Sequence, residues 1–178
     1  MNNSAAANTS SAKQVAINGI SIALVFIATG FINLRLPIVA NGGLIHLGNV
    51  PLFLAAIIFG KKTGAISGAV GMALFDLFSG WTLWAPFTFV IVGIMGWVVG
   101  KITEDKSHNT ILWYVIAILA ALAIKIVGYY IAEGIIYGNW VAPAASIPGN
   151  IVQILTAAVI VLPLAKPLKK QLSAITRS

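Results

Sequence analysis

The chain has 178 residues, of which 59% are hydrophobic and 8% are charged, whereas an ordinary soluble domain carries about 25% charged residues. This composition excludes a soluble globular domain and predicts an all-α integral membrane protein in the cell (plasma) membrane. Apart from Arg35 and Lys125, the lysines and arginines behind the net charge of +7 lie in the expected tails and turns, so the charge indicates orientation in the lipid bilayer and no nucleic-acid partner.

The first residues of the chain are small, polar and uncharged. We expect residues 1–12 to form a disordered cytoplasmic tail and residues 13–178 to form a single membrane domain. The first helix is expected from about Lys13 to Leu34, long enough to cross about 30 Å of hydrocarbon. Small residues spaced three and four apart would form a groove on this helix: Ala12, Ala16, Gly19 and Ala23. Either another protein or the chain's own helices could fill that groove.

Residues Arg35 to Pro51 (RLPIVANGGLIHLGNVP) interrupt the helical pattern with prolines and glycines, yet they are too apolar for a loop that floats in water. Irregular backbone persists at membrane depth only when it is buried in protein or lines a wet cavity. We therefore predict that this first extracellular loop folds inward and carries Asn41, His46 and Asn49 towards a pocket. A tightly packed extracellular connector is the alternative.

The next segment is short. We expect Asn49 to cap a helix that begins at Pro51 and ends at Gly60. A dozen residues rise only about 18 Å, so this segment cannot span alone and the preceding loop has to fill the missing depth. The third helix, from about Thr63 to Phe78, is rich in glycine and is expected to pack closely, with Asp76 near its outer end.

The fourth helix is expected to run from about Trp81 to Lys101. Trp84 lies at its outer end, where a tryptophan is most often a membrane-interface anchor. A flat ligand could instead stack on this ring. The sequence leaves both roles open.

The fifth helix, from about Thr110 to Ile136, carries Lys125, Tyr129 and Glu133 on one stripe, because they are spaced four apart. A lysine at the centre of a spanning helix costs about 2.5–3.5 kcal/mol on insertion scales. Such a residue is by default part of a functional site. Alternatively, Lys125 pairs with Asp76 and only holds the bundle together.

The sixth helix is expected from about Ser146 to Leu164. Asn150 and Gln153 are three residues apart, so both amides could face the same cavity, or they could pair with the backbone of the bundle. The count is six transmembrane helices with both termini in the cytoplasm. On this topology the unusual polar residues fall in the outer half, which favours an outward-facing site for a small molecule.

Several kinds of chemistry are missing from the sequence. It has no cysteine and two histidines, and it lacks a P-loop, an HExxH motif and a GxSxG motif. We therefore expect no enzyme activity, no cofactor and no metal site. The bundle can bind a molecule but cannot power transport, so any pumping needs a partner. A self-sufficient channel or facilitator, and an intramembrane enzyme or assembly factor, are the competing interpretations.

Four stretches carry a family resemblance: GISIA at 19–23, GGLIHLGNVP at 42–51, GKKTGAISGAVGMALFDLFSG at 60–80 and WAPFTFVIVGIMGWVVGKI at 84–102. With them the chain resembles the substrate-binding S components of energy-coupling factor (ECF) vitamin transporters. The similarity is greatest to the branch that includes the riboflavin-type and hydroxymethylpyrimidine-type S components.

The resemblance implies partners and site residues. Gly19 and Ala23, or else Ala12 and Ala16, would dock onto a transmembrane coupling protein (T component) that binds two ATPase subunits. The first outer loop would act as a lid over the vitamin. The other vitamin contacts that the resemblance implies are Trp84, Lys125, Tyr129, Glu133, Asn150 and Gln153.

The side chains available suit a small, flat, neutral ring with hydroxymethyl groups. Trp84 or Tyr129 could stack on such a ring, while His46 and the amides could match its nitrogens and hydroxyls. We therefore expect hydroxymethylpyrimidine or pyridoxine as the substrate. Riboflavin, whose tricyclic ring needs a larger cavity, and pantothenate are the alternatives.

Overall fold

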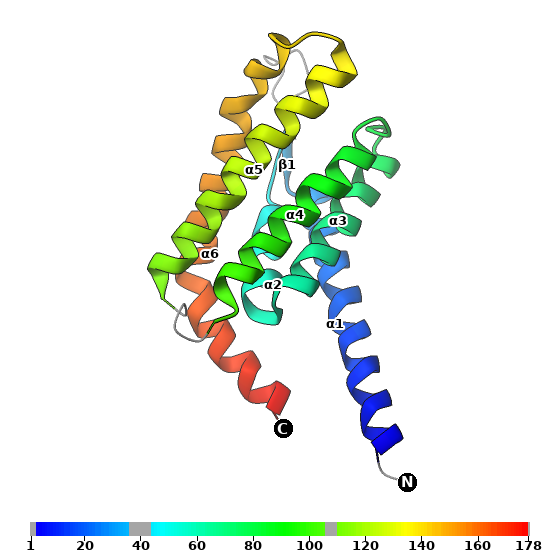
Figure 1. The fold of residues 1–178 in the computed structure, drawn as a ribbon, viewed down its shortest axis with the longest axis vertical. Coiled ribbons are helices and arrows are strands. Elements are labelled where there is room, and N and C mark those ends of the chain that lie inside the picture. Colours follow the sequence, from blue (N-terminus) through cyan, green and yellow to red (C-terminus); the bar gives the residue numbers. More distant parts are fainter. Residues whose placement is uncertain (1–2, 36–43, 106–109, 178) are drawn as a thin grey trace.

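The computed structural model describes residues 3–35, 44–105 and 110–177, which form a helical bundle with one small hairpin (Figure 1). The elements are α1 (Asn3–Phe31), β1 (Asn33–Arg35), β2 (Leu44–His46), α2 (Asn49–Phe59), α3 (Lys61–Phe78), α4 (Ala85–Thr103), α5 (Ile111–Tyr137), the 3-10 helix η2 (Ala142–Ser146) and α6 (Ile147–Arg177). The two chain termini lie at the same end of the molecule, opposite the corner where α5 meets η2 (Figure 1).

Most predicted helix ends lie close to those in the structure. However, α1 ends at Phe31 rather than at Leu34, which lies in β1, and α4 begins at Ala85 rather than near Trp81. The larger differences are at the two ends of the chain. α1 begins at Asn3 rather than at Lys13, so the described part of the expected tail is helical. α6 continues to Arg177, beyond the expected end at Leu164. The C-terminal extension is rich in alanine, leucine, lysine and glutamine, which favour helix. In the N-terminal extension alanine is the frequent helix-favouring residue.

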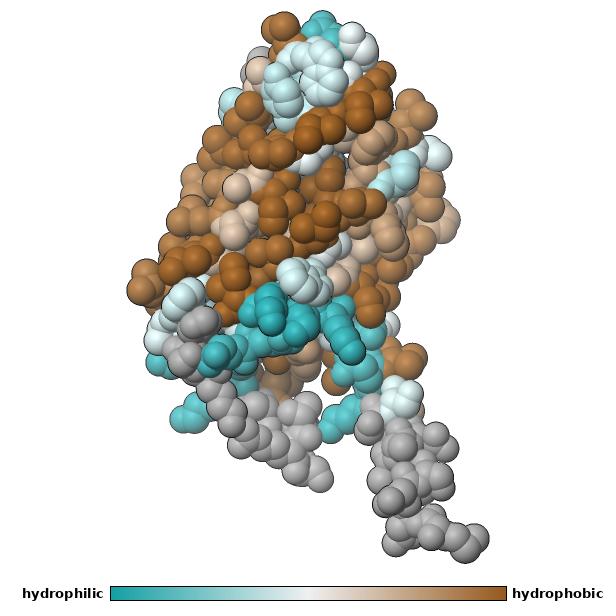
Figure 2. Space-filling model, viewed as in Figure 1, coloured by the Kyte–Doolittle hydropathy of each residue, from teal (hydrophilic) through white to brown (hydrophobic). Residues whose placement is uncertain are grey.

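Within the described residues, four helical segments are long and apolar enough to cross a membrane: Ser11–Phe31, Ala85–Thr103, Ile111–Tyr137 and Ala142–Leu172. α2 has 11 residues and rises about 16 Å, which confirms that this segment is too short to span alone. Apolar side chains cover the middle of the molecule, and hydrophilic ones gather at the end where the termini lie (Figure 2). This surface suits a lipid bilayer. Six crossings stay a prediction.

The short helix α2 lies at the centre of the bundle. It contacts α1, α3, α4 and α6, while α3 packs on α4, α4 on α5 and α5 on α6. Leu52, Phe53 and Ala56 of α2 are fully buried in the main apolar core. Because its neighbours surround it, α2 can be short and apolar without spanning the bilayer on its own.

Glycines bring α3 and α4 into close contact, as expected for the third helix. A Cβ added at Gly96 would lie 2.2 Å from the carbonyl oxygen of Gly64, and one at Gly100 would lie 2.3 Å from the Cα of Lys61. No real Cβ can approach backbone so closely, so these two helices pack backbone against backbone. The residues without side chains thus set the spacing between α3 and α4.

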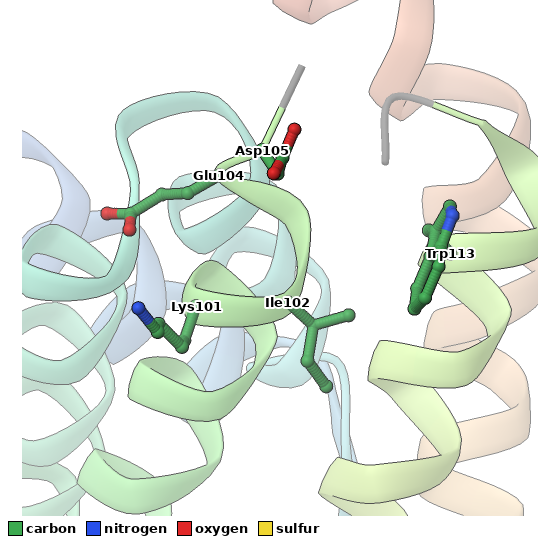
Figure 3. A pocket seen from close by; sticks show the side chains of 5 residues that line it. All are labelled: Lys101, Ile102, Glu104, Asp105 and Trp113. Atoms are coloured by element: carbon green, nitrogen blue, oxygen red, sulfur yellow. The ribbon is translucent and has the colours of Figure 1, made fainter. Parts of the chain in front are cut away.

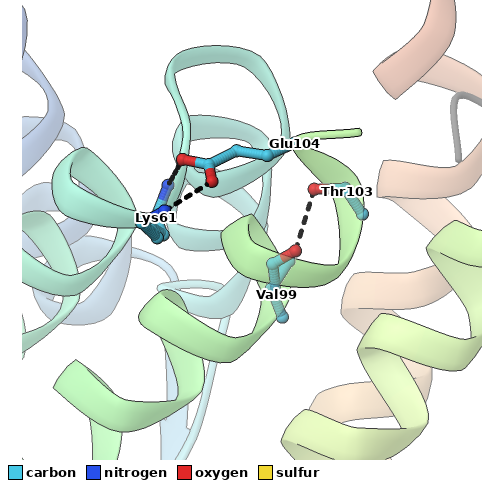
Figure 4. A network of polar contacts seen from close by, with 4 residues as sticks. All are labelled: Lys61, Val99, Thr103 and Glu104. Atoms are coloured by element: carbon cyan, nitrogen blue, oxygen red, sulfur yellow. Dashed lines mark hydrogen bonds and ion pairs between the residues drawn. The ribbon is translucent and has the colours of Figure 1, made fainter. Parts of the chain in front are cut away.

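Polar contacts join the beginning of α3 to the end of α4 (Figure 4). The ammonium group of Lys61 forms an ion pair with Glu104 at 2.8 Å, and the Lys61 backbone N–H donates to the same carboxylate at 3.2 Å. The Thr103 hydroxyl donates to the carbonyl oxygen of Val99 at 2.8 Å. Lys169 of α6 donates to the carbonyl oxygen of Thr103 at 2.9 Å, which ties α6 to the end of α4.

Acidification should slightly weaken the ion pair between Lys61 and Glu104. The hydrogen bond from the Lys61 side chain holds the pKa of Glu104 below its ordinary value of 4.5. A carboxyl group with a lowered pKa stabilises the fold above its ordinary pKa, and this stabilisation is lost as the pH falls through its folded-state pKa. Because solvent screens this partly exposed pair, the expected loss is under about 1 kcal/mol. Thermal unfolding in detergent should show this loss at acid pH for the wild type and not for Glu104→Gln; equal losses in both would contradict it.

Candidate binding site

Polar side chains gather in the part of the bundle away from the chain termini. They come from β2 and from five helices and are buried or half-buried: His46, Asn49, Asp76, Thr88, Lys125, Tyr129 and Gln153. We call these seven residues the polar cluster. It contains five of the nine residues that the sequence predicted for substrate binding, although the chain separates them by up to about a hundred positions.

The hairpin β1–β2 delivers His46 to the cluster. β1 and β2 pair antiparallel with Asn33 opposite His46, and β2 contacts both α1 and α6. At Gly48 an added Cβ would lie 2.1 Å from the Thr29 hydroxyl oxygen, so only glycine lets the chain pass α1 here. The described part of the predicted inward-folding loop therefore packs against the bundle. Asn41 lies outside the described residues.

The imidazole of His46 is held in one tautomer. The N–H of Gly48 donates to Nδ1 of His46 at 3.2 Å, so the ring proton is on Nε2, which remains a donor. Burial and, to a smaller extent, the charge of Lys125 lower the pKa of His46 to about 3. His46 is therefore neutral at physiological pH.

Asn49 does not cap α2, contrary to the prediction from the sequence. The N-cap residue is Gly48, and Asn49 is the first residue of the helix. Its side chain is fully buried and its Nδ2 donates to Oε1 of Gln153 on α6 at 3.4 Å. Within the described part of the chain, Oδ1 of Asn49 has no hydrogen-bond donor. The capping prediction failed because the side chain turns inward to α6 instead of back to its own helix.

Lys125 is 1% exposed and lies in the middle of α5. Its ammonium group is 5.2 Å from the centre of the Tyr129 ring, within the range of a cation–π contact. Among the residues that the structure describes, none forms an ion pair with Lys125. Asp76 acts on it electrostatically from a longer distance. The proposed direct pairing of these two residues is thus absent from the described contacts.

A chain of hydrogen bonds connects α5 to α3 through α4. The hydroxyl of Tyr129 lies 3.1 Å from the hydroxyl of Thr88, and Thr88 in turn hydrogen-bonds the side chain of Asp76. The second carboxylate oxygen of Asp76, Oδ2, is buried and has no donor among the described residues. The cluster thus contains two buried acceptors that are not satisfied, on Asn49 and on Asp76.

Three other predicted residues lie around the cluster. Glu133 is buried and accepts a hydrogen bond from the Ser146 hydroxyl, which ties α5 to η2. Trp84 is half-buried and makes edge contacts with the rings of Trp81 at 5.1 Å and Tyr137 at 6.0 Å. Asn150 is half-buried in the first turn of α6. The structure does not bring Trp84 or Asn150 into the hydrogen bonds described above.

The sequence prediction missed Thr88 and did not assign Asp76 to the site. Thr88 lies on the buried stripe of α4 together with Ala85, Val92 and Met95. A threonine in such a stripe is easily interpreted as core, because its methyl group packs like an apolar side chain. The helical spacing was the available signal, but the partners of Thr88 are on other helices and only the fold reveals them.

The small-residue stripe of α1 is exposed. Its members Ala12, Ala16, Gly19 and Ala23 all lie on the surface. No described residue comes within 4 Å of a Cβ built on Gly19. α1 packs on α3 through the opposite face, which carries Ser21 and Val25. The described helices of this chain therefore do not fill the groove.

A hollow of about 480 Å³ lies at the other end of α4. It is lined by Lys101, Ile102, Glu104, Asp105 and Trp113. Trp113 of α5 faces the end of α4, whereas Lys101 and Glu104 point towards α3 (Figure 3). No predicted substrate-binding residue lines this hollow, and it is separate from the polar cluster.

The polar cluster offers both hydrogen-bond donors and acceptors. Lys125 and Nε2 of His46 are donors, and Asn49 and Asp76 offer acceptors. In the described ranges there is no group of three or more His, Asp or Glu side chains that could hold a metal ion. The arrangement fits a small neutral molecule that carries both donors and acceptors.

Comparisons with known proteins agree on one family. A family model described as the S component of the ECF-type riboflavin transporter matches residues 9–170. The thiamine precursor transporter HmpT of Lactococcus lactis is 30% identical over 83% of this chain and 82% of its own length. An uncharacterized protein of Pyrococcus woesei is 31% identical over 79% of this chain and 93% of its own length.

A solved structure has the same fold. It is described as the S component of a bacterial ECF transporter and superimposes with a TM-score of 0.72. The match covers 91% of this chain and 98% of the other chain, at 22% sequence identity. At this identity the likeness concerns the fold, and it extends over nearly all of both chains.

Proposed function

The chain belongs to the S component family of ECF-type riboflavin transporters, and from this membership we propose that it captures hydroxymethylpyrimidine or pyridoxine for import. The family consists of membrane transporter components for vitamin uptake and is not a family of enzymes. Riboflavin and pantothenate are the alternative substrates in the same role. The proposed site is the polar cluster with Asn41, Trp84, Glu133 and Asn150 around it.

The main support for this proposal is the buried side chain of Lys125. A charged side chain with 1% exposure in the middle of an apolar helix is costly, and such residues persist in membrane proteins where they serve a function. The neighbouring amides of Asn49 and Gln153 and the neutral His46 add the donors and acceptors that a vitamin ring needs. The similarity to a thiamine precursor transporter supports a pyrimidine substrate.

We further propose six crossings with both termini in the cytoplasm. Both termini lie at one end of the bundle, where α4 also ends (Figure 1). Lys61 and Lys169 contact Glu104 and Thr103 at the end of α4, and Lys101 lies in its last turn. Lysines concentrate on the cytoplasmic side of membrane proteins. The polar cluster would then be reached from the outside, as an importer requires.

Binding of candidate vitamins to the purified protein tests the substrate. Hydroxymethylpyrimidine or pyridoxine should raise the thermal unfolding temperature in detergent and should bind in calorimetry, because ligand that binds only the folded state stabilises it. A shift with riboflavin or pantothenate alone would transfer the function to that vitamin. Uptake into liposomes that contain this chain alone would support a facilitator and contradict the need for partner subunits.

The coupling partner is testable on α1. We propose that the exposed stripe docks onto a T component that carries two ATPase subunits. Gly19→Leu should leave vitamin binding by the isolated protein unchanged, because Gly19 is exposed and distant from the polar cluster. It should lower ATP-dependent uptake by the assembled transporter roughly 10-fold or more, since bulk in a close helix contact is poorly tolerated.

The matched control adds bulk elsewhere on the same helix. Leu24 is 52% exposed and lies outside the stripe, so Leu24→Phe should leave uptake near the wild-type level. Normal uptake with Gly19→Leu, or equal losses with both variants, would show that the stripe is not the docking surface.

A further inference from the structure

The polar cluster contains the carboxylate of Asp76, whose second oxygen has no donor among the described residues. We propose that Asp76 recognises an amino group on the substrate ring, so that the site selects an aminopyrimidine over rings that carry oxygen at the same position. The proposal rests on the proposed function and deepens it, because it assigns one substrate group to one side chain.

The hydrogen bonds around Asp76 have a definite direction. An ionised carboxylate can only accept, so the hydroxyl of Thr88 must donate to Asp76. That hydroxyl has a single hydrogen, and therefore the Tyr129 hydroxyl donates to Thr88 over their 3.1 Å separation. The hydroxyl hydrogen of Tyr129 thus points to Thr88, and that of Thr88 points to Asp76. The chain holds the carboxylate in place and leaves Oδ2 to be satisfied from elsewhere.

Oδ2 of Asp76 needs a donor. It is buried, and in the described part of the chain no donor reaches it. Buried acceptors in folded proteins are almost always hydrogen-bonded, so an unsatisfied one in a binding site identifies a place for a ligand donor. Lys125, the buried cation that acts on Asp76, does not form an ion pair with it among the described residues. The proposed ring lies between these two side chains.

The charges of this pair define the chemical pattern. Lys125 can only donate and Asp76 can only accept, so a molecule between them needs an acceptor next to a donor. A 4-aminopyrimidine has this pattern on one edge, because its amino group donates and the adjacent ring nitrogen accepts. The two charges cancel, which favours a neutral ring over a phosphate or a carboxylate. Oδ1 of Asn49, the other unsatisfied acceptor, is available to a hydroxyl on the same ligand.

Two matched ligands and one isosteric variant test the assignment. The ligands are 4-amino-5-hydroxymethyl-2-methylpyrimidine and its 4-hydroxy analogue, whose keto tautomer presents an acceptor where the amino group was. The full-length wild-type protein should bind the amino compound at least about 100-fold more tightly, because the analogue would place a carbonyl against Asp76. Asp76→Asn should reduce the ratio of the two affinities (amino compound over 4-hydroxy analogue) to less than about 10-fold, because the new amide can donate to the carbonyl.

A structural role for Asp76 would give a different result. Equal losses for both ligands in Asp76→Asn, or equal affinities of the wild type for both, would overturn the assignment. If Asp76→Asn does not fold, Thr88→Val takes its place: it removes the hydrogen bond that orients Asp76 and should likewise reduce the ratio. An unchanged ratio in a folded Thr88→Val would then overturn the assignment.

If the proposed function is wrong, the binding results differ from those expected when only the Asp76 assignment is wrong. In that case the wild type would bind neither pyrimidine, while another vitamin raised its unfolding temperature. That outcome would overturn both the pyrimidine substrate and the assignment of Asp76. If the wild type binds the amino compound tightly but Asp76→Asn does not change the ratio of the two affinities, only the assignment of Asp76 is overturned.

Discussion

Lys125→Met should weaken vitamin binding by roughly 10- to 100-fold, because a hydrogen bond to a charged group contributes about 1.5–3 kcal/mol. Methionine has a similar length and can fill the same space, so the packing around residue 125 should persist. The side chain is 1% exposed, and the variant removes the cost of burying its charge. The unfolding temperature without vitamin should therefore stay the same or rise. Isothermal titration calorimetry and thermal unfolding of the same preparations measure both effects.

The control for this variant is a lysine far from the cluster. Lys166 is exposed on α6, so Lys166→Met should bind vitamin like the wild type. If Lys125→Met also bound like the wild type, the buried lysine would not contact the substrate. A variant that lost stability instead of affinity would indicate that Lys125 holds the bundle together.

Gly96→Ala should destabilise the bundle by about 3 kcal/mol or more, although it adds a single methyl group. The new Cβ would lie 2.2 Å from the carbonyl oxygen of Gly64, and backbone on the facing helix cannot rotate away as a side chain can. Overpacking of a well-packed core typically costs about 1–3 kcal/mol, and separating two helices disturbs many contacts at once. Thermal unfolding in detergent and the yield of monodisperse protein measure the loss.

The same substitution at an open position provides the control. A Cβ at Gly149 in the first turn of α6 meets no described residue within 4 Å. Alanine favours helix over glycine by about 1 kcal/mol, so Gly149→Ala should be neutral or slightly stabilising. If Gly96→Ala were equally neutral, α3 and α4 would not pack as closely as the structure indicates.

Local sequence patterns determined the membrane class, the helix positions and the family. Apolar runs of sufficient length specify a membrane helix wherever they occur, because the cost of exposing polar backbone to lipid does not depend on distant residues. The same reasoning identified α2 as too short to span, and the stripe of small residues on α1. Helix ends were less certain, since α6 continues to Arg177, beyond the expected end at Leu164.

The tertiary structure alone decided which polar groups meet. Asn49 looked like a helix cap, and only the position of α6 shows that its amide reaches Gln153, 104 residues away. The sequence prediction did not include Thr88, and only the packing of α3, α4 and α5 shows that it connects Asp76 to Tyr129. The physical reason is that periodicity reveals which face of a helix is buried, whereas a hydrogen bond between helices depends on their rotation and depth relative to one another. The sequence thus determined a membrane bundle of a known family, and the packing of its helices decided how its polar residues form a site.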